Sequence, residues 1–132
     1  MTAPVELPSL VNLGGAIRRG ETTSEAATER CLAAIRDRDP SINAFIRVLG
    51  DDAREAARTA DRELRGGRDR GLLHGIPISI KDIIDIAGQP TTAGSKVRDG
   101  HVAAHDAPVI ERLQRHTPDY RRKPVWHDQK SR

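Results

Sequence analysis

The chain has few residues of the kinds that build a large apolar core. Aromatic residues make up 2% of its 132 residues (Phe45, Tyr120 and Trp126), and hydrophobic residues make up 36%. That share is low beside the roughly 45–50% of an average globular domain, a figure that includes Gly. A chain of this length has room for one domain. Its core must therefore consist of Ile, Leu, Val and Ala, and we expect it to be thin.

Three further absences bear on where the protein works. Cys31 is the only cysteine, so no disulfide can form within the chain, and we expect this residue in the apolar stripe of a helix. Residues 1–8 lack the positive and apolar regions of a signal peptide. No run approaches the roughly 18 apolar residues of a membrane span. We therefore expect a cytoplasmic protein without a membrane partner.

Positive charge is concentrated at one end of the chain. Residues 115–132 hold six basic and two acidic residues, a surplus of four, although the formal net charge of the whole chain is only +3. This break in composition predicts a body, residues 1–114, and a disordered basic tail, residues 115–132. Charge and two aromatic side chains could bring the tail to a nucleic acid. Its prolines and mixed charges make a poor binding surface, so we do not expect a nucleic-acid partner.

Helical patterns occupy four segments of the body. Ser9 stands before a short helix that ends at Gly20, and the spacing from Thr22 to Glu25 is that of a capping box before a second helix. Pro40 is expected to stop the second helix. The last two helices are expected to open at Asp51 or Asp52 and at Asp106, with Gly66 and Gly67 ending the third and Pro108 in the first turn of the fourth.

Strand-like patterns occupy residues 44–49 and residues 75–80. Residues 88–100 are rich in Gly, Thr and Ser and predict a loop. The order of elements, α-α-β-α-β-loop-α, places the chain in the α/β class. Two strands are few for a self-standing sheet, so we expect the sheet to be incomplete.

One lysine, Lys81, stands at the end of the second strand-like run, Ile76 to Ile80. A lysine can act as a base only when burial or neighbouring cations make its uncharged form accessible near neutral pH. Otherwise it is a solvated charge at the edge of the fold. Asp82 and Asp85 follow it and are expected to be solvated turn residues.

Residues of about 9–114 resemble the opening portion of the amidase signature family. The most specific cue is the segment LLHGIPISIKDIIDIAG at 72–88, followed by TTAGS at 91–95 and DAPVIERL at 106–113. Weaker cues are INAF at 42–45 and the pair Ala60-Asp61 in an alanine-rich helix. The matches occur in the family's order. The resemblance therefore implies the N-terminal part of a large α/β/α core.

The resemblance also implies a reaction. Members of the family hydrolyse carboxamides, or transfer ammonia from glutamine as the A-type component of a tRNA-dependent amidotransferase, through a Ser–cis-Ser–Lys triad. Lys81 matches the catalytic lysine, which accepts the proton that makes a serine hydroxyl nucleophilic. The implied partner of an intact relative is a small amide substrate. The resemblance assigns no substrate-binding residue here.

The sequence departs from the family after residue 113. The two catalytic serines of the family lie in a Gly- and Ser-rich stretch downstream of the lysine, and no such stretch follows here. Ser79 and Ser95 are the nearest serines, and neither matches a family nucleophile. We therefore expect a truncated polypeptide without turnover. A frameshift near residue 114 would explain both the missing stretch and the tail, and the nucleotide sequence would test it.

Interpretations from other classes stay open. The chain could be a non-enzymatic interaction module or, through its tail, a small nucleic-acid binder. His101 and His105 are four residues apart, but the Glu of the zinc-hydrolase motif does not follow His101, so we expect neither a metal nor a cofactor. Isoleucines around Lys81 that nothing covers would promote self-association.

Overall fold

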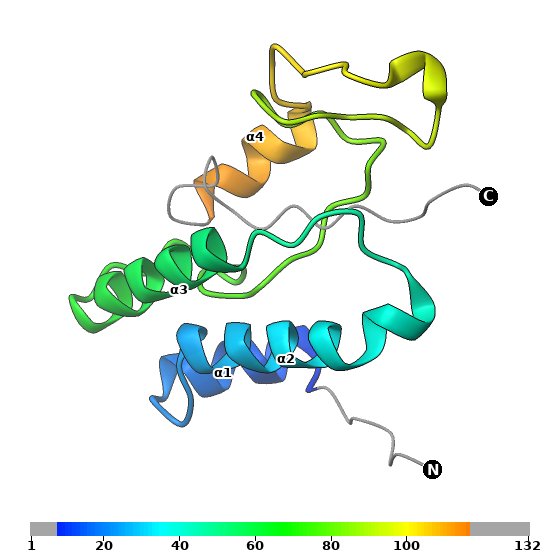
Figure 1. Cartoon of the computed structure of the whole chain (residues 1–132). Helices are drawn as coiled ribbons and strands as arrows, with labels where there is room; N and C mark the ends of the chain where they lie inside the picture. The colour runs from blue at the N-terminus through cyan, green and yellow to red at the C-terminus, as the bar shows by residue number, and fades with distance from the viewer. Residues whose placement is uncertain (1–7, 117–132) are drawn as a thin grey trace.

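The structure is a computed structural model that describes residues 8–116. These residues form four α-helices and one short 3₁₀-helix: α1 (Leu10–Arg18), α2 (Ser24–Ile42), α3 (Gly50–Arg65), η1 (Lys96–Arg98) and α4 (Pro108–Arg115). Helix α2 packs along α3, α1 lies behind α2, and α4 stands on the far side of α3 (Figure 1). The predicted tail lies outside the described residues from residue 117 onward, so its disorder stays a prediction.

The predicted start of the first helix is confirmed, whereas the second helix is capped by Thr23, one residue after the Thr22 of the predicted capping box. The Ser9 hydroxyl accepts a hydrogen bond from the Asn12 N–H at 3.2 Å and caps α1. The Thr23 hydroxyl accepts one from the Ala26 N–H at 3.0 Å and caps α2. Each bond satisfies a backbone donor that has no partner inside its helix. The predicted end of α3 at Gly66 is confirmed as well.

The prediction that Pro40 stops α2 is wrong. The helix continues through Pro40 to Ile42, and Asn43 ends it in a left-handed conformation with φ of 54°. The Asp39 carboxylate explains the position of this end, because it accepts hydrogen bonds from the N–H groups of Ala44 (2.7 Å) and Phe45 (3.1 Å). A proline in the last turn removes one hydrogen bond, and the helix tolerates that loss because it is about to end.

The predicted caps of the last two helices are also corrected. Leu49 precedes α3, so Asp51 and Asp52 lie in its first turn. Their negative charges interact favourably with the positive end of the helix dipole. Ala107 precedes α4, with Pro108 in the first turn as predicted. Asp106 instead links α4 to an earlier segment of the chain: its carboxylate accepts hydrogen bonds from the Ala87 N–H (2.7 Å) and from the side-chain amide of Gln114 in α4 (2.5 Å).

Neither predicted strand is a strand in the structure. Residues 44–49 and 75–80 run without helical structure and contain no strand, although Phe45 takes part in a single β-bridge, and a further isolated bridge joins Pro90 and Val102. A strand exists only as one side of a hydrogen-bonded pair. The two segments are therefore connections without a strand in the part of the chain that the structure describes.

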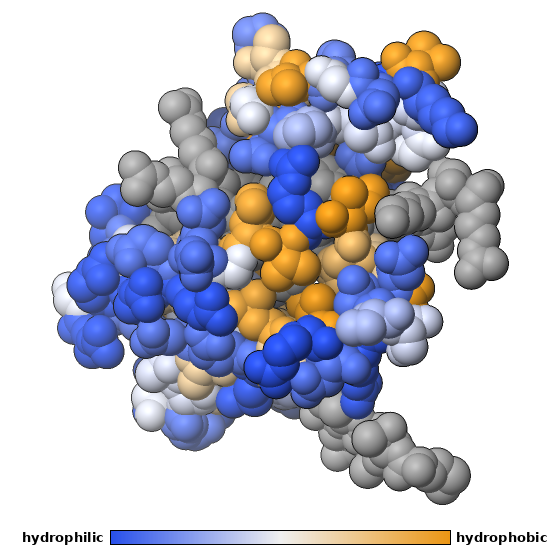
Figure 2. Space-filling view, viewed as in Figure 1, coloured by the Kyte–Doolittle hydropathy of each residue, from blue (hydrophilic) through white to orange (hydrophobic). Residues whose placement is uncertain are grey.

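The core is thin and has two parts. Small side chains of α3 (Ala53, Ala57 and Ala60) are buried against α2, which lets the two helices approach closely. The second part is a cluster of Ile80, Ile86 and Ile110, against which Leu49 and Ile78 pack. Several large apolar side chains remain outside, including Ile83 at 61% exposure, and Figure 2 shows a hydrophobic area at the centre of this face. Within residues 8–116, no helix is both long and apolar enough to cross a membrane.

Candidate functional site

Lys81 lies on the outer face of the segment that carries it. Ile80 and Asp82 are buried, whereas Ser79, Lys81 and Ile83 are exposed. Lys81 also opens a turn, because its carbonyl accepts a hydrogen bond from the Ile84 N–H at 3.0 Å. No described residue forms a hydrogen bond or an ion pair with the Lys81 ammonium. The amine therefore lies in water, and the burial that a lysine base needs is not provided by residues 8–116.

Asp82 is buried at 3% exposure and connects the lysine segment to the loop of residues 91–95. Its carboxylate accepts hydrogen bonds from the Thr92 N–H, at 2.9 Å, and from the Thr92 hydroxyl. Its backbone carbonyl accepts a third from the Ala93 N–H at 2.9 Å. The expectation that Asp82 is a solvated turn residue is wrong. The local sequence around Asp82 does not reveal its burial, because the threonine that binds it, Thr92, is ten residues away.

The loop itself has a defined shape. Ala93 (φ 51°) and Gly94 (φ 67°) are both left-handed, and the Ser95 N–H donates to the Thr92 carbonyl at 2.9 Å, which makes a type I′ turn. The Ser95 hydroxyl accepts from the Val97 N–H and so opens η1. Neither the Ser95 hydroxyl nor that of exposed Ser79 is hydrogen-bonded to Lys81. No described serine is thus arranged to be activated by the lysine.

Asp85 behaves differently from Asp82. Its carboxylate is 3.7 Å from the Arg98 guanidinium, and its side chain is 43% exposed. A pair at this distance and exposure contributes little to stability. Asp85 is thus half-exposed and not fully solvated as the sequence suggests, since its Oδ1 is buried without a hydrogen bond.

The lysine segment is anchored at its other end by Gly75. Its carbonyl accepts a hydrogen bond from the Ser24 hydroxyl at 2.7 Å, and its backbone is left-handed with φ of 81°. The Ser24 N–H donates to the Asp61 carboxylate at 2.8 Å, and the Glu25 N–H donates to the other oxygen at 3.1 Å. Asp61 of α3 thus binds the start of α2. The sequence offered this residue only as part of the Ala60-Asp61 cue and gave it no role.

His74, immediately before Gly75, is fully buried. Its Nδ1 accepts a hydrogen bond from the Arg70 N–H at 3.1 Å, so the ring proton is on Nε2, which lies 3.1 Å from a carboxylate oxygen of Glu63. That second contact acts through charge and is not a well-aligned hydrogen bond. Burial lowers the pKa of His74, and the hydrogen bond with Arg70 lowers the pKa of Glu63. His74 is accordingly a neutral structural histidine.

An ion pair joins this region to α1. The Arg18 guanidinium binds Asp69 through two hydrogen bonds, of 2.8 and 2.9 Å, and also donates to the carbonyl of Gly71. Hydrogen bonding from Arg18 lowers the pKa of Asp69 to about 2. The connector between α3 and the lysine segment is therefore held in place by α1, a helix that is distant from it in the sequence.

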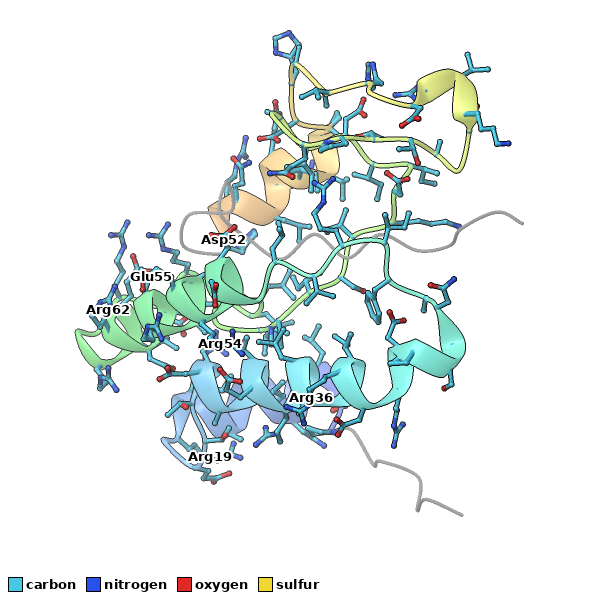
Figure 3. The ribbon with its side chains drawn as sticks, in the orientation of Figure 1. Arg19, Arg36, Asp52, Arg54, Glu55 and Arg62 are labelled. Carbon is cyan, nitrogen blue, oxygen red and sulfur yellow. The ribbon has the colours of Figure 1, made fainter. Side chains whose placement is uncertain are left out.

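The remaining candidates form no second site. Within residues 8–116, no group of three or more His, Cys, Asp or Glu side chains could hold a metal ion. Cys31 is half-buried on α2, and burial raises the pKa of its thiol. The solvent side of α2 and α3 carries arginine–glutamate pairs, including Arg54 with Glu29, and Figure 3 shows Arg54 and Arg62 on α3. Exposed pairs of this kind stabilise little.

Comparison with known proteins gives a consistent result. The family model "Amidase" matches residues 26–117. The A-type component of glutamyl-tRNA(Gln) amidotransferase from Chloroflexus aurantiacus is 47% identical over 98 residues, which are 74% of this chain and 20% of the relative. The corresponding protein of Thermobifida fusca is 41% identical over 106 residues, 80% of this chain and 21% of the relative. The chain thus spans about a fifth of the length of these curated relatives.

Solved structures agree. Native peptide amidase from Stenotrophomonas maltophilia superposes with a TM-score of 0.77 at 32% identity, covering 95% of this chain and 25% of that protein. An amidase family protein from Bacillus anthracis superposes with a TM-score of 0.74 at 25% identity, covering 94% and 24%. The described helices and their connections are a fragment of an α/β fold. With the family model covering more than half of its residues, the chain belongs to the amidase family.

Proposed function

We propose that the chain supplies the lysine side of a carbon–nitrogen hydrolase site, with Lys81 as the proton acceptor. The observation that carries the proposal is the position of Lys81 next to Asp82, whose carboxylate and carbonyl bind the 91–95 loop. In the sequence resemblance, IKD belongs to the most specific cue, and TTAGS is the next match in the family's order. The substrate class is a small carboxamide, and the proposed location is the cytoplasm.

The chemistry assigned to Lys81 is general-base catalysis. A serine hydroxyl attacks an amide carbonyl only as its proton leaves, and a desolvated lysine can accept that proton directly or through a second hydroxyl. In a complete site, Lys81 would be covered on its outer face. The relatives named above include both a peptide amidase and components of an amidotransferase, so hydrolysis and ammonia transfer are both consistent with the proposal.

A chimera tests the role of Lys81. Residues 26–114 would replace the matching segment of the Stenotrophomonas maltophilia peptide amidase, and amide hydrolysis would be measured. We expect activity with Lys81 present and a loss of at least about a hundredfold with Lys81→Ala, the scale of a missing general base. Lys96→Ala, at an exposed lysine of η1, is the matched control. Equal activity of the Lys81→Ala chimera would contradict the proposal.

For the 132-residue polypeptide by itself we propose no turnover. Its lysine is exposed, and neither Ser79 nor Ser95 is hydrogen-bonded to that lysine. The test is ammonia release from simple amides and from glutamine, with Lys81→Ala beside the unchanged chain. Ammonia release that disappears with Lys81→Ala would show that these residues already contain a working nucleophile.

A non-enzymatic interaction module is the second candidate. The exposed large apolar side chains, which include Ile46, Val48 and Ile83, favour it, because exposed apolar patches on a monomer often mark interaction sites. Co-purification with an intact amidase would support this function. It is compatible with the absence of turnover, so only the chimera separates it from the first proposal.

A further inference from the structure

The turn that binds α1 is built around a buried histidine. His74 is fully buried, and its Nδ1 accepts a hydrogen bond from the Arg70 N–H at 3.1 Å. The His74 N–H donates to the Gly71 carbonyl at 2.9 Å, and the Gly71 N–H donates to the Asp69 carboxylate at 2.9 Å. These bonds close residues 69–74 into one turn, the connector turn, whose shape depends on an unprotonated Nδ1.

The connector turn also supplies the contacts that hold the end of α1. Arg18, in the last turn of α1, donates two hydrogen bonds to Asp69 and one to the Gly71 carbonyl. The helix lies close to the chain here, because a Cβ added at Gly14 would be 3.4 Å from the Leu72 carbonyl oxygen. The bonds of Arg18 therefore persist only while the connector turn keeps its shape.

Protonation of His74 would break the connector turn at a defined point. A second proton on the ring converts Nδ1 from an acceptor into a donor, which would then face the Arg70 N–H, another donor. An acceptor on the same side is Asp69 Oδ1, which is 3.8 Å from Nδ1 and already bonded to Arg18 and Gly71. A bond from Nδ1 to this oxygen requires the turn to move, and that movement withdraws Asp69 and Gly71 from Arg18.

The surroundings of His74 oppose protonation while the turn is closed. Burial lowers the pKa of His74, and the Arg70 guanidinium acts in the same direction. The carboxylates of Asp69 and of Glu63, which is 3.1 Å from Nε2, favour the charged ring but do not outweigh burial. Opening of the turn admits water to the ring, so opening and protonation favour each other. Charged or titratable groups that in turn contact these partners are Arg18, Arg68 and His116.

We propose that His74 and Arg18 form a pH-sensitive latch: protonation of His74 opens the connector turn and releases α1, while α2 and α3 stay folded. Asp61 joins α2 to α3 through bonds that do not involve the connector turn. Release of α1 uncovers the start of the lysine segment, since a Cβ added at Gly14 would lie 3.8 Å from the Ile76 Cδ1. The latch requires no amide chemistry, so the latch and the proposed function can fail separately.

Amide hydrogen exchange of the 132-residue chain tests the latch. Each exchange rate is divided into that of an unstructured chain at the same pH, which gives the protection of the amide. We expect the protection of residues 14–18 to fall about five- to tenfold from pH 7.5 to pH 5.5, the range over which a released histidine with a pKa of about 6.5 takes up its proton.

The urea dependence of the same exchange separates local release from global unfolding. Low urea concentrations should change the exchange of α1 little and that of α2 and α3 steeply, because release of one helix exposes far less surface than unfolding of the chain. Equal urea dependence in the three helices would mean that α1 leaves only when the whole chain unfolds, and would overturn the proposal.

His74→Gln assigns the pH response. Glutamine offers an oxygen as acceptor but does not titrate, so the pH dependence of α1 protection should disappear. His116→Gln changes the other histidine beside the connector turn and should leave the response as in the unchanged chain. A response of the same size in His74→Gln would rule the latch out.

The reverse coupling gives a test that does not require the His74 variant to fold. Arg18→Lys keeps the charge of α1 but cannot form the paired hydrogen bonds to Asp69. If protonation releases α1, a weaker latch must raise the pKa of His74, because coupling between two equilibria is reciprocal. NMR titration of the His74 ring should give a pKa higher by about 0.7, which corresponds to a fivefold weaker latch. An unchanged pKa would show that α1 and His74 are not coupled.

Discussion

The Asp61 carboxylate on α3 binds the backbone N–H of Ser24 at the start of α2, at 2.8 Å. Both residues are buried, and the second carboxylate oxygen accepts from the next N–H, that of Glu25, at 3.1 Å. A helix start leaves N–H groups without partners inside the helix, and a negative charge there is stabilising. A side chain from another helix thus supplements the cap made by Thr23, and it fixes α2 to α3.

Removal of this carboxylate should destabilise the fold. Asp61→Ala leaves the buried Ser24 N–H without its acceptor, and we expect the free energy of unfolding to fall by about 1–3 kcal/mol. Urea unfolding followed by circular dichroism measures the change. Asp99→Ala, at an exposed aspartate, is the control and should change stability by less than about 0.5 kcal/mol. Equal effects of the two substitutions would contradict a structural role for Asp61.

Gly75 is a position where both backbone conformation and space exclude a side chain. Its φ is 81°, and an added Cβ would lie 3.2 Å from the Ser24 Cβ, which cannot move away without breaking the Ser24–Gly75 hydrogen bond. We expect Gly75→Ala to lower the free energy of unfolding by about 2–4 kcal/mol, from left-handed strain and overpacking together.

Gly100 provides the matched control for Gly75. Its φ is 79°, and an added Cβ would meet nothing within 4 Å. Gly100→Ala therefore carries only the backbone penalty of about 1–2 kcal/mol. The difference between the two substitutions in the same unfolding assay isolates the steric part. If Gly100→Ala proved as destabilising as Gly75→Ala, contact with Ser24 would play no part.

The bond between Asp82 and Thr92 should control the mobility of the 91–95 loop. Thr92→Val removes the hydroxyl that donates to Asp82, whereas Thr92→Ser keeps it. We expect amide hydrogen exchange of Ala93 and Ser95 to become faster by about tenfold in Thr92→Val, as expected for the loss of roughly 1–1.5 kcal/mol, and to stay near the original rate in Thr92→Ser. Faster exchange in both variants would point to packing of the threonine methyl group instead.

His74 should make stability depend on pH. Burial lowers the pKa of His74 below 6.5, so the unfolded chain binds a proton that the folded chain rejects as the pH falls. The free energy of unfolding should therefore decrease from about pH 6.5 downward. The pKa values of Glu63 and Asp69 are lowered in the folded chain, so protonation of these carboxylates also weakens the fold in acid. This loss of stability begins only below their ordinary pKa values of 4.5 and 3.8. Between pH 6.5 and pH 5, we therefore attribute the decrease in the free energy of unfolding to His74.

A comparison of variants assigns this window. His74→Gln removes the titrating group, and the slope of unfolding free energy against pH between pH 5 and pH 6.5 should become smaller. His101→Gln, at an exposed histidine, should leave the slope unchanged. Denaturant unfolding at a series of pH values gives both slopes. A slope that persists in His74→Gln would show that another group is responsible.

Local chemistry in the sequence was sufficient for most of the helices. Ser9 caps α1 where the sequence predicts, and the cap of α2 at Thr23 is one residue from the predicted Thr22, because such caps involve only residues three positions apart. The end of α2 is not where Pro40 predicts it, because the helix continues to Ile42 and the Asp39 carboxylate binds the N–H groups of residues 44 and 45. Local reasoning also treated Asp106 as a cap, although its partners lie 8 and 19 residues away.

The sequence by itself determined the family, the helices and the candidate lysine, because each depends on residue identity and short-range spacing. Only the tertiary structure decided that Asp82 is buried against Thr92, that Asp61 binds the start of α2, and that Lys81 points into water. These facts depend on which distant segments meet. Burial and hydrogen bonding arise only when such segments come together. They decide whether a lysine can act as a base and whether an aspartate can hold two segments together.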